Sequence, residues 1–110
     1  MIAEGFLAHG ARVYISARKA EACDQAAHEL AKYGHCVSLP HDVSTVAGCQ
    51  ALADAYAGHE TTLDILVNNA GAAWGEAFDA FPESGWDKVV DLNLKTPFFL
   101  TKALSGPLRA

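Results

Sequence analysis

Cysteine is scarce in this sequence, and its positions lack the spacing that a metal site needs. The three cysteines are Cys23, Cys36 and Cys49, and no two of them form a C-x-x-C pair. The five histidines also lack ligand spacing, so we treat them as surface or loop residues. We therefore expect no metal site, and we expect the cysteines to be reduced thiols that pack as small hydrophobic side chains.

The sequence also has no excess of positive charge and no long apolar run. Its 110 residues carry 8 Lys and Arg against 13 Asp and Glu, a net charge of −5. This charge disfavours binding to nucleic acid or to an anionic membrane surface. No run approaches the roughly 20 apolar residues that cross a bilayer. The first residues include Glu4 where a signal peptide has bases, so we expect a cytoplasmic location.

What the sequence does contain is a regular alternation of two hydrophobic patterns. Strand-like runs alternate with segments of helical spacing, and the length allows one domain at most. Strands that alternate with helices predict a parallel sheet of the doubly wound α/β class over residues 1–110. We predict helices over 1–9, 19–33, 45–57 and 84–104, strands over 11–16, 36–40 and 63–67, and a loop from 68 to 82.

The third predicted strand ends in an unusual cluster of amides and small residues. Leu63-Asp64-Ile65-Leu66-Val67 runs directly into Asn68-Asn69-Ala70-Gly71. An apolar run with little alternation is typical of a strand that is covered on both faces. Ala70 and Gly71 leave room for a ligand at the backbone, and ligands of open α/β sheets bind beyond the carboxyl ends of the strands. We therefore expect a bound cofactor here.

This strand and its Asn-Asn-Ala-Gly end resemble the signature of the short-chain dehydrogenase/reductase family, which binds NAD or NADP. The resemblance covers essentially the whole chain. It implies that Asn69, Ala70 and Gly71 contact the cofactor and that Asn69 steadies the central strand. A plain strand-to-loop turn capped by Asn and Gly is the alternative.

The resemblance further implies an incomplete Rossmann-like fold. In the family, a first strand and a Gly-rich turn come before a helix that Met1 to Gly10 resembles. The catalytic Ser and Tyr-x-x-x-Lys would follow residue 110. Because the absent strand lies between 11–16 and 63–67, we expect a gap there or direct pairing of the two. We also expect a marginally stable chain that is inactive alone.

The end of the first strand favours NADP over NAD. A carboxylate at this position binds the adenosine 2′-hydroxyl, whereas a 2′-phosphate requires Arg without a carboxylate. Ala17 stands at what resembles the acidic position, and Arg18 follows it. A guanidinium binds phosphate through its planar fork. The alternative is a solvated Arg18-Lys19 pair at the start of a helix.

His41-Asp42-Val43 follows the second predicted strand at its carboxyl end. By resemblance to the family, Asp42 faces the adenine amino group and the backbone amide of Val43 contributes a further contact. As an alternative, Asp42 caps the helix over 45–57, although Ser44 or Thr45 can serve as that cap.

Asn93 is the candidate catalytic residue. It lies four residues before Pro97 in the last predicted helix. Because Pro97 has no backbone N–H, the carbonyl of Asn93 loses its helical partner and can hold a water molecule. In the family, the matching Asn supports a water in the proton relay that leads to the catalytic Lys. A buried Asn that bonds to the backbone at a kink is the alternative.

Together these features predict an NADP-dependent oxidoreductase that transfers hydride between NADPH and a small-molecule carbonyl or secondary alcohol. The run from Gly10 to Cys23 and the segment from Asn68 to Gly75 are similar to bacterial β-ketoacyl reductases of the rhamnolipid-associated type. This similarity suggests a 3-oxoacyl thioester substrate, and family membership implies a homo-oligomer for the full-length form. The alternative is a non-catalytic nucleotide-binding remnant or a truncated reading frame.

Overall fold

The computed structural model describes residues 2–71 and 73–110, and it divides the chain into two compact units, Met1–Asp42 and Val43–Ala110. Met1 belongs to the first predicted helix and Ala72 to the predicted loop, and both lie outside the described residues.

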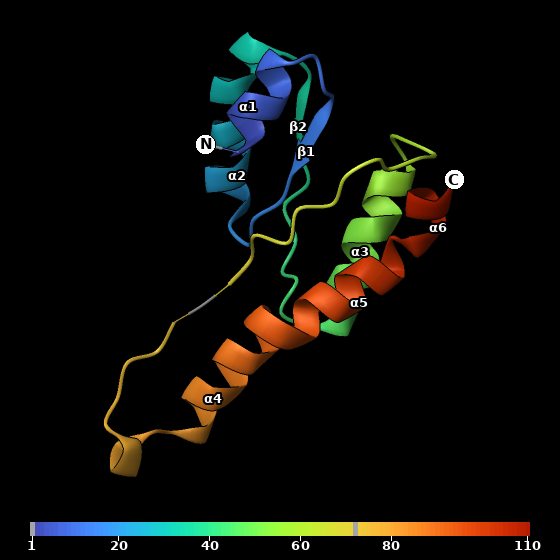
Figure 1. Ribbon diagram of the computed structural model, residues 1–110. Coiled ribbons are helices and arrows are strands. Elements are labelled where there is room, and N and C mark those ends of the chain that lie inside the picture. The colour runs from blue at the N-terminus through green and yellow to red at the C-terminus, as the bar shows by residue number, and fades with distance from the viewer. Residues whose placement is uncertain (1, 72) are drawn as a thin grey trace. The chain divides into compact units, whose positions relative to one another are not determined.

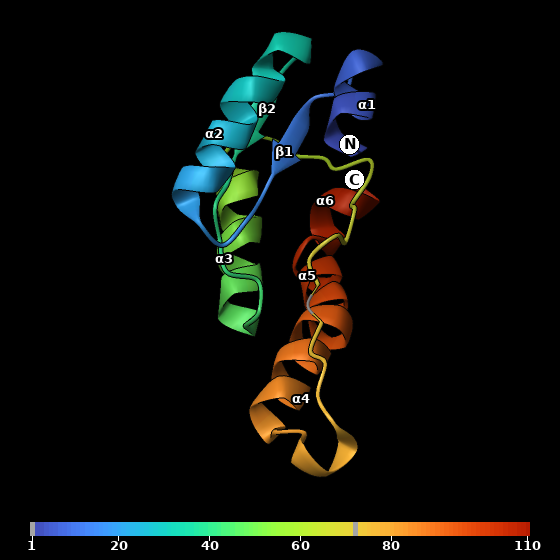
Figure 2. The ribbon, with the colours of Figure 1, turned by 90° about the vertical axis from the view of Figure 1, so that its left-hand side faces the viewer.

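The first unit is a pair of parallel strands with helices on one face. Figures 1 and 2 show α1 and α2 on the same side of β1 and β2. Val13 pairs with Cys36 and Ile15 with Ser38, so the predicted parallel arrangement of these two segments is confirmed. The strands are shorter than the predicted 11–16 and 36–40. In chain order the elements are α1 (Ile2–Ala8), β1 (Val13–Ile15), α2 (Ala20–Leu30), the 3₁₀ turn η1 (Ala31–Tyr33) and β2 (Cys36–Ser38).

A glycine ends α1 and turns the chain into β1. Gly10 has a φ of 87°, a left-handed conformation that favours glycine. Its N–H donates to the carbonyl of Leu7, and the N–H of Ala11 donates to the carbonyl of Phe6. This bonding pattern is a Schellman motif, which satisfies the last carbonyls of a helix. The buried side chains of the unit form its core: Leu7, Cys23, Ala27, Leu30 and Leu39.

The second unit is helical. Figures 1 and 2 show α4 and α5 continuing as one rod, with the π-helical turn η3 between them. Helix α3 packs against α5. Buried side chains of the unit are Cys49, Leu52, Ala53, Tyr56, Leu100 and Leu104, together with the polar Thr96. The elements are α3 (Val46–Ala57), the 3₁₀ turn η2 (Phe78–Ala80), α4 (Glu83–Val90), η3 (Asp91–Lys95), α5 (Thr96–Ala103) and the short α6 (Ser105–Arg109), which the sequence did not predict.

The predicted strand over 63–67 is wrong. In the described part of the chain the only sheet consists of β1 and β2, and residues 63–67 form neither helix nor strand. The N–H of Leu63 instead donates to the carbonyl of Pro107, and Ile65 and Val67 are 58% and 45% exposed. An apolar run has the propensity for a strand, but it becomes one only beside a backbone that completes its hydrogen bonds. Direct pairing of 63–67 with 11–16 is therefore also wrong, and the segment stays outside the sheet.

None of the helices among residues 2–71 and 73–110 has both the length and the apolar character needed to span a bilayer. All three cysteines are free, as predicted. Cys23 and Cys49 are also buried as expected, whereas Cys36 is only partly buried.

The N-cap of α3 provides a test of this fold. The Thr45 side chain accepts a hydrogen bond of 3.0 Å from the N–H of Gly48. Thr45→Ala removes this acceptor and is expected to lower the free energy of unfolding by about 1 kcal/mol. Urea denaturation measures the change. Thr45→Ser keeps the hydroxyl and should match the wild type, and equal losses in the two variants would show that the cap does not contribute.

Candidate functional site

The parallel ladder of the first unit continues beyond its two strands. The N–H of Leu39 donates to the carbonyl of Ile15 at 2.8 Å, and the N–H of His41 donates to that of Ala17 at 3.1 Å. Arg18 directly follows Ala17, and Asp42 directly follows His41. The structure therefore brings both residues to the carboxyl edge of the sheet.

The chemistry of this edge combines a cation and an anion, both on exposed residues. Arg18 and Asp42 are solvent-exposed, and Ala17 presents no carboxylate between them. A guanidinium can bind a phosphate through paired N–H donors, and a carboxylate can accept from an amino group. The edge thus carries complementary groups for a phosphorylated ligand that also bears an amine.

One alternative for Asp42 is wrong. The N-cap of α3 is Thr45, whose side chain accepts from the N–H of Gly48. Capping of this helix therefore does not explain a carboxylate at position 42.

In the second unit, Gly71 and Asn93 lie against each other. A methyl group placed on Gly71 would lie 2.9 Å from Oδ1 of Asn93, closer than a Cβ can approach an oxygen without displacing it. Gly71 had been expected to make room for a ligand, and here it makes room for the Asn93 side chain. Asn69 and Ala70 precede this contact and are exposed, as is Asn93. The structure therefore brings the end of the Asn-Asn-Ala-Gly segment and the candidate catalytic residue together.

Asn93 lies in a π-helical turn instead of the regular helix that the sequence predicts. The backbone N–H of Thr96 donates to the carbonyl of Asp91, five residues earlier. Pro97 gives the physical reason, because in an α-helix its ring would collide with the carbonyl of Asn93. The wider π turn shifts the register by one residue ahead of Pro97. Such turns are rare and frequently occur at functional sites.

Thr96 is a residue that sequence reasoning missed. Its side chain is only 3% exposed, and its Oγ1 lies 2.6 Å from the carbonyl oxygen of Val43. The Cys49 thiol donates to the same carbonyl at 3.5 Å, and burial raises the pKa of that thiol, so it stays protonated at neutral pH. The only signal in the sequence was a hydroxyl directly before the apolar run of residues 97–100.

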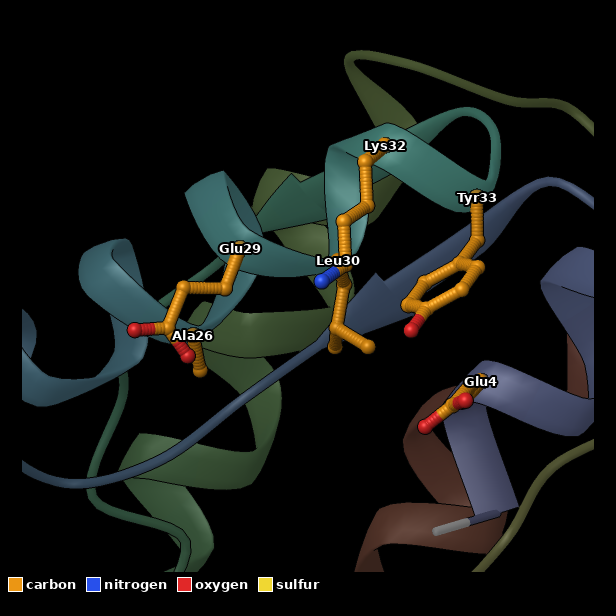
Figure 3. A pocket seen from close by; sticks show the side chains of 6 residues that line it. All are labelled: Glu4, Ala26, Glu29, Leu30, Lys32 and Tyr33. Carbon is orange, nitrogen blue, oxygen red and sulfur yellow. The ribbon is translucent and has the colours of Figure 1, made fainter.

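A hollow elsewhere in the first unit does not fit a cofactor. Figure 3 shows it between α1 and α2, with a volume of about 170 Å³. Its lining residues Lys32 and Tyr33 belong to the turn that leads into β2, so it lies toward the start of the strands. Ligands of open α/β sheets bind at the opposite edge. The lining consists of Glu4, Ala26, Glu29, Leu30, Lys32 and Tyr33.

Metal binding has no support among residues 2–71 and 73–110, where no three His, Cys, Asp or Glu side chains cluster closely enough to hold an ion.

Comparison with known proteins connects this geometry to a family. The short chain dehydrogenase profile matches residues 1–109. The chain is 49% identical over 109 residues to the rhamnolipids biosynthesis 3-oxoacyl-[acyl-carrier-protein] reductase of Pseudomonas aeruginosa, covering 99% of this chain and 43% of that protein.

Solved structures agree with the sequence comparison. The Pseudomonas aeruginosa RhlG/NADP active-site complex superposes with a TM-score of 0.95 at 48% identity, covering 98% of this chain and 42% of that one. L-Sorbose reductase from Gluconobacter frateurii, complexed with NADPH and L-sorbose, gives a TM-score of 0.92 at 28% identity over 98% of this chain and 42% of the other.

The chain thus spans under half the length of these relatives, and the match accounts for its partial Rossmann-like α/β fold. Because the match extends over residues 1–109, the family assignment does not depend on any single residue of the candidate site. The chain belongs to the short-chain dehydrogenase/reductase family.

Proposed function

We propose that the protein containing this chain is an NADP-dependent oxidoreductase that transfers hydride between NADPH and a carbonyl or secondary alcohol. The observation that carries the proposal is the pairing of Ala17 with His41, which delivers Arg18 and Asp42 to the same edge of the sheet. Two similar structures that are complexes with NADP and NADPH support the choice of cofactor.

The residues at this edge fit the adenosine end of NADP. Exposed Arg18 would bind the 2′-phosphate, and Ala17 adds no carboxylate to repel it. Asp42 would accept from the adenine amino group, and the Val43 amide would add a backbone contact. Asn69, Ala70 and Gly71 would contact the cofactor farther along.

Asn93 would act in proton transfer and not in cofactor affinity. The bound nicotinamide supplies the hydride, so the protein must supply the proton. Asn93 is exposed, and its Oδ1 lies against Gly71 within the π turn. By resemblance to the family, Asn93 would support a water molecule that passes a proton toward the reacting oxygen.

One relative supports a proposal for the substrate. The chain is 49% identical to a reductase of 3-oxoacyl groups carried on acyl carrier protein, which supports a 3-oxoacyl thioester as substrate. We further propose that residues 1–110 form part of a single dinucleotide-binding domain and that the full-length protein is a cytoplasmic homo-oligomer.

The cofactor assignment is tested at Arg18. Arg18→Ala in the full-length protein should weaken NADPH binding about tenfold and leave NADH binding unchanged, because only NADPH carries the 2′-phosphate. Fluorescence titration with each nucleotide measures both constants. Lys19→Ala, which removes the neighbouring exposed cation, serves as the control. A wild-type protein that binds NADH more tightly than NADPH would refute the assignment.

The role of Asn93 is tested by comparing turnover with affinity. Asn93→Leu should lower kcat at least tenfold with little change in the Kd for NADPH, since general acid–base steps contribute about a hundredfold or more. Steady-state kinetics and nucleotide titration on the same preparations separate the two effects. Unchanged turnover would remove the relay role.

The contact between Gly71 and Asn93 gives an independent test with a matched control. Gly71→Ala places a methyl group 2.9 Å from Asn93 Oδ1 and must displace that side chain, whereas Gly75 has no atom within 4 Å of the corresponding position. We expect Gly71→Ala to lower kcat and Gly75→Ala to leave it unchanged. Equal kinetics for the two variants would show that the position of Asn93 does not matter for turnover.

A further inference from the structure

Thr96 carries a buried hydroxyl that the proposed reaction does not use. It lies at the start of α5 and is 3% exposed. Its Oγ1 is 2.6 Å from the carbonyl oxygen of Val43 and 2.7 Å from that of Asp91. Val43 directly follows Asp42, and Asp91 is the first residue of the π turn. The two carbonyls therefore belong to segments far apart in the sequence. A single oxygen therefore touches both segments.

The other hydrogen bonds of the two carbonyls indicate which of them accepts the hydroxyl hydrogen of Thr96. A threonine hydroxyl has one hydrogen to donate. The carbonyl of Asp91 already accepts the backbone N–H of Thr96 in the π turn. The carbonyl of Val43 has only the thiol of Cys49, a weak donor at 3.5 Å, as a further partner in the described contacts. The hydroxyl hydrogen therefore goes to Val43.

We propose that Thr96 is a positioning residue that couples the adenosine-binding segment to the turn that carries Asn93. This inference rests on the proposed function. By holding the Val43 carbonyl, Thr96 restricts the backbone of Val43 and so the direction of the amide between Asp42 and Val43. The backbone N–H of Thr96 donates to the Asp91 carbonyl, so restricting Thr96 through its side chain also restricts the start of the π turn that carries Asn93.

The coupling has a defined direction of effect. A nucleotide held by Asp42 and the Val43 amide reduces the motion of Val43, and through Thr96 this restriction extends to the π turn. Loss of the hydroxyl should therefore affect cofactor binding and turnover together. Asp42 and Asn93 variants should each affect mainly one of them. A hydroxyl that serves only stability would change neither.

The test uses the full-length protein with Thr96→Val, which keeps the shape and removes the hydroxyl, and Thr96→Ser, which keeps the hydroxyl. Thr61→Val makes the same substitution at an exposed position and is the control. Hydrogen exchange of the amides in 43–48 and 91–96 is followed with and without NADPH. Kd for NADPH, kcat and Tm are measured on the same variants.

We expect Thr96→Val to speed exchange in both segments, to raise the Kd for NADPH and to lower kcat, each about three- to tenfold, the range for one lost hydrogen bond. NADPH should protect residues 91–96 in the wild type and in Thr96→Ser but not in Thr96→Val. If valine prevents folding, Thr96→Ala removes the same hydroxyl and is judged by the same criteria.

If Thr96→Val lowers only the Tm, and NADPH still protects the π turn from exchange in this variant, the proposed coupling is refuted. It is also refuted if Thr96→Ser behaves like Thr96→Val. A wild-type protein that does not bind NADPH would refute the proposed function. In that case exchange without nucleotide still decides whether Thr96 links the two segments, since faster exchange in only one of them would refute the link.

Discussion

The parallel hydrogen-bond ladder between β1 and β2 is the constraint on which the candidate cofactor site depends. Parallel strands end at the same edge, and here the ladder extends past both strands to the pair of Ala17 and His41. Arg18 follows Ala17 in the chain, and Asp42 follows His41. Backbone pairing thus brings both residues to the same edge of the sheet.

A different constraint shapes the second unit. Pro97 cannot donate a backbone hydrogen bond and cannot follow a regular α-helical turn without a clash. The helix accommodates it with the π turn of Asp91–Lys95, which displaces Asn93 from the position that an unbroken α-helix would give it. Gly71 then leaves space for the Asn93 amide. One residue without an N–H and one without a side chain together determine where this amide lies.

Much of this could be predicted from the sequence, because it depends on chain order. The alternation of elements and the parallel pairing of two strands follow from hydrophobic pattern alone, as does the placement of Arg18 and Asp42 just beyond those strands. The Asn-Asn-Ala-Gly segment identified the family before any geometry was known. Composition also indicated correctly that the cysteines remain free.

What could not be predicted depends on contacts between distant segments. Residues 63–67 have the composition of a buried strand, but pairing requires a neighbour, which local pattern does not reveal. The π turn was anticipated only as a loss of one hydrogen bond at Pro97. Thr96 was missed because its partner, Val43, lies 53 residues away in the sequence.

The exposed apolar run beside the Asn-Asn-Ala-Gly segment has a consequence for handling the protein. Ile65 and Val67 lie in the open within a short stretch of high β-propensity that contains no proline. Such stretches are prone to stack between chains as cross-β aggregates. Asp64 interrupts the stretch with an exposed charge and acts as a gatekeeper against this association. An exposed carboxylate within this apolar stretch is therefore expected to oppose such association of the isolated chain.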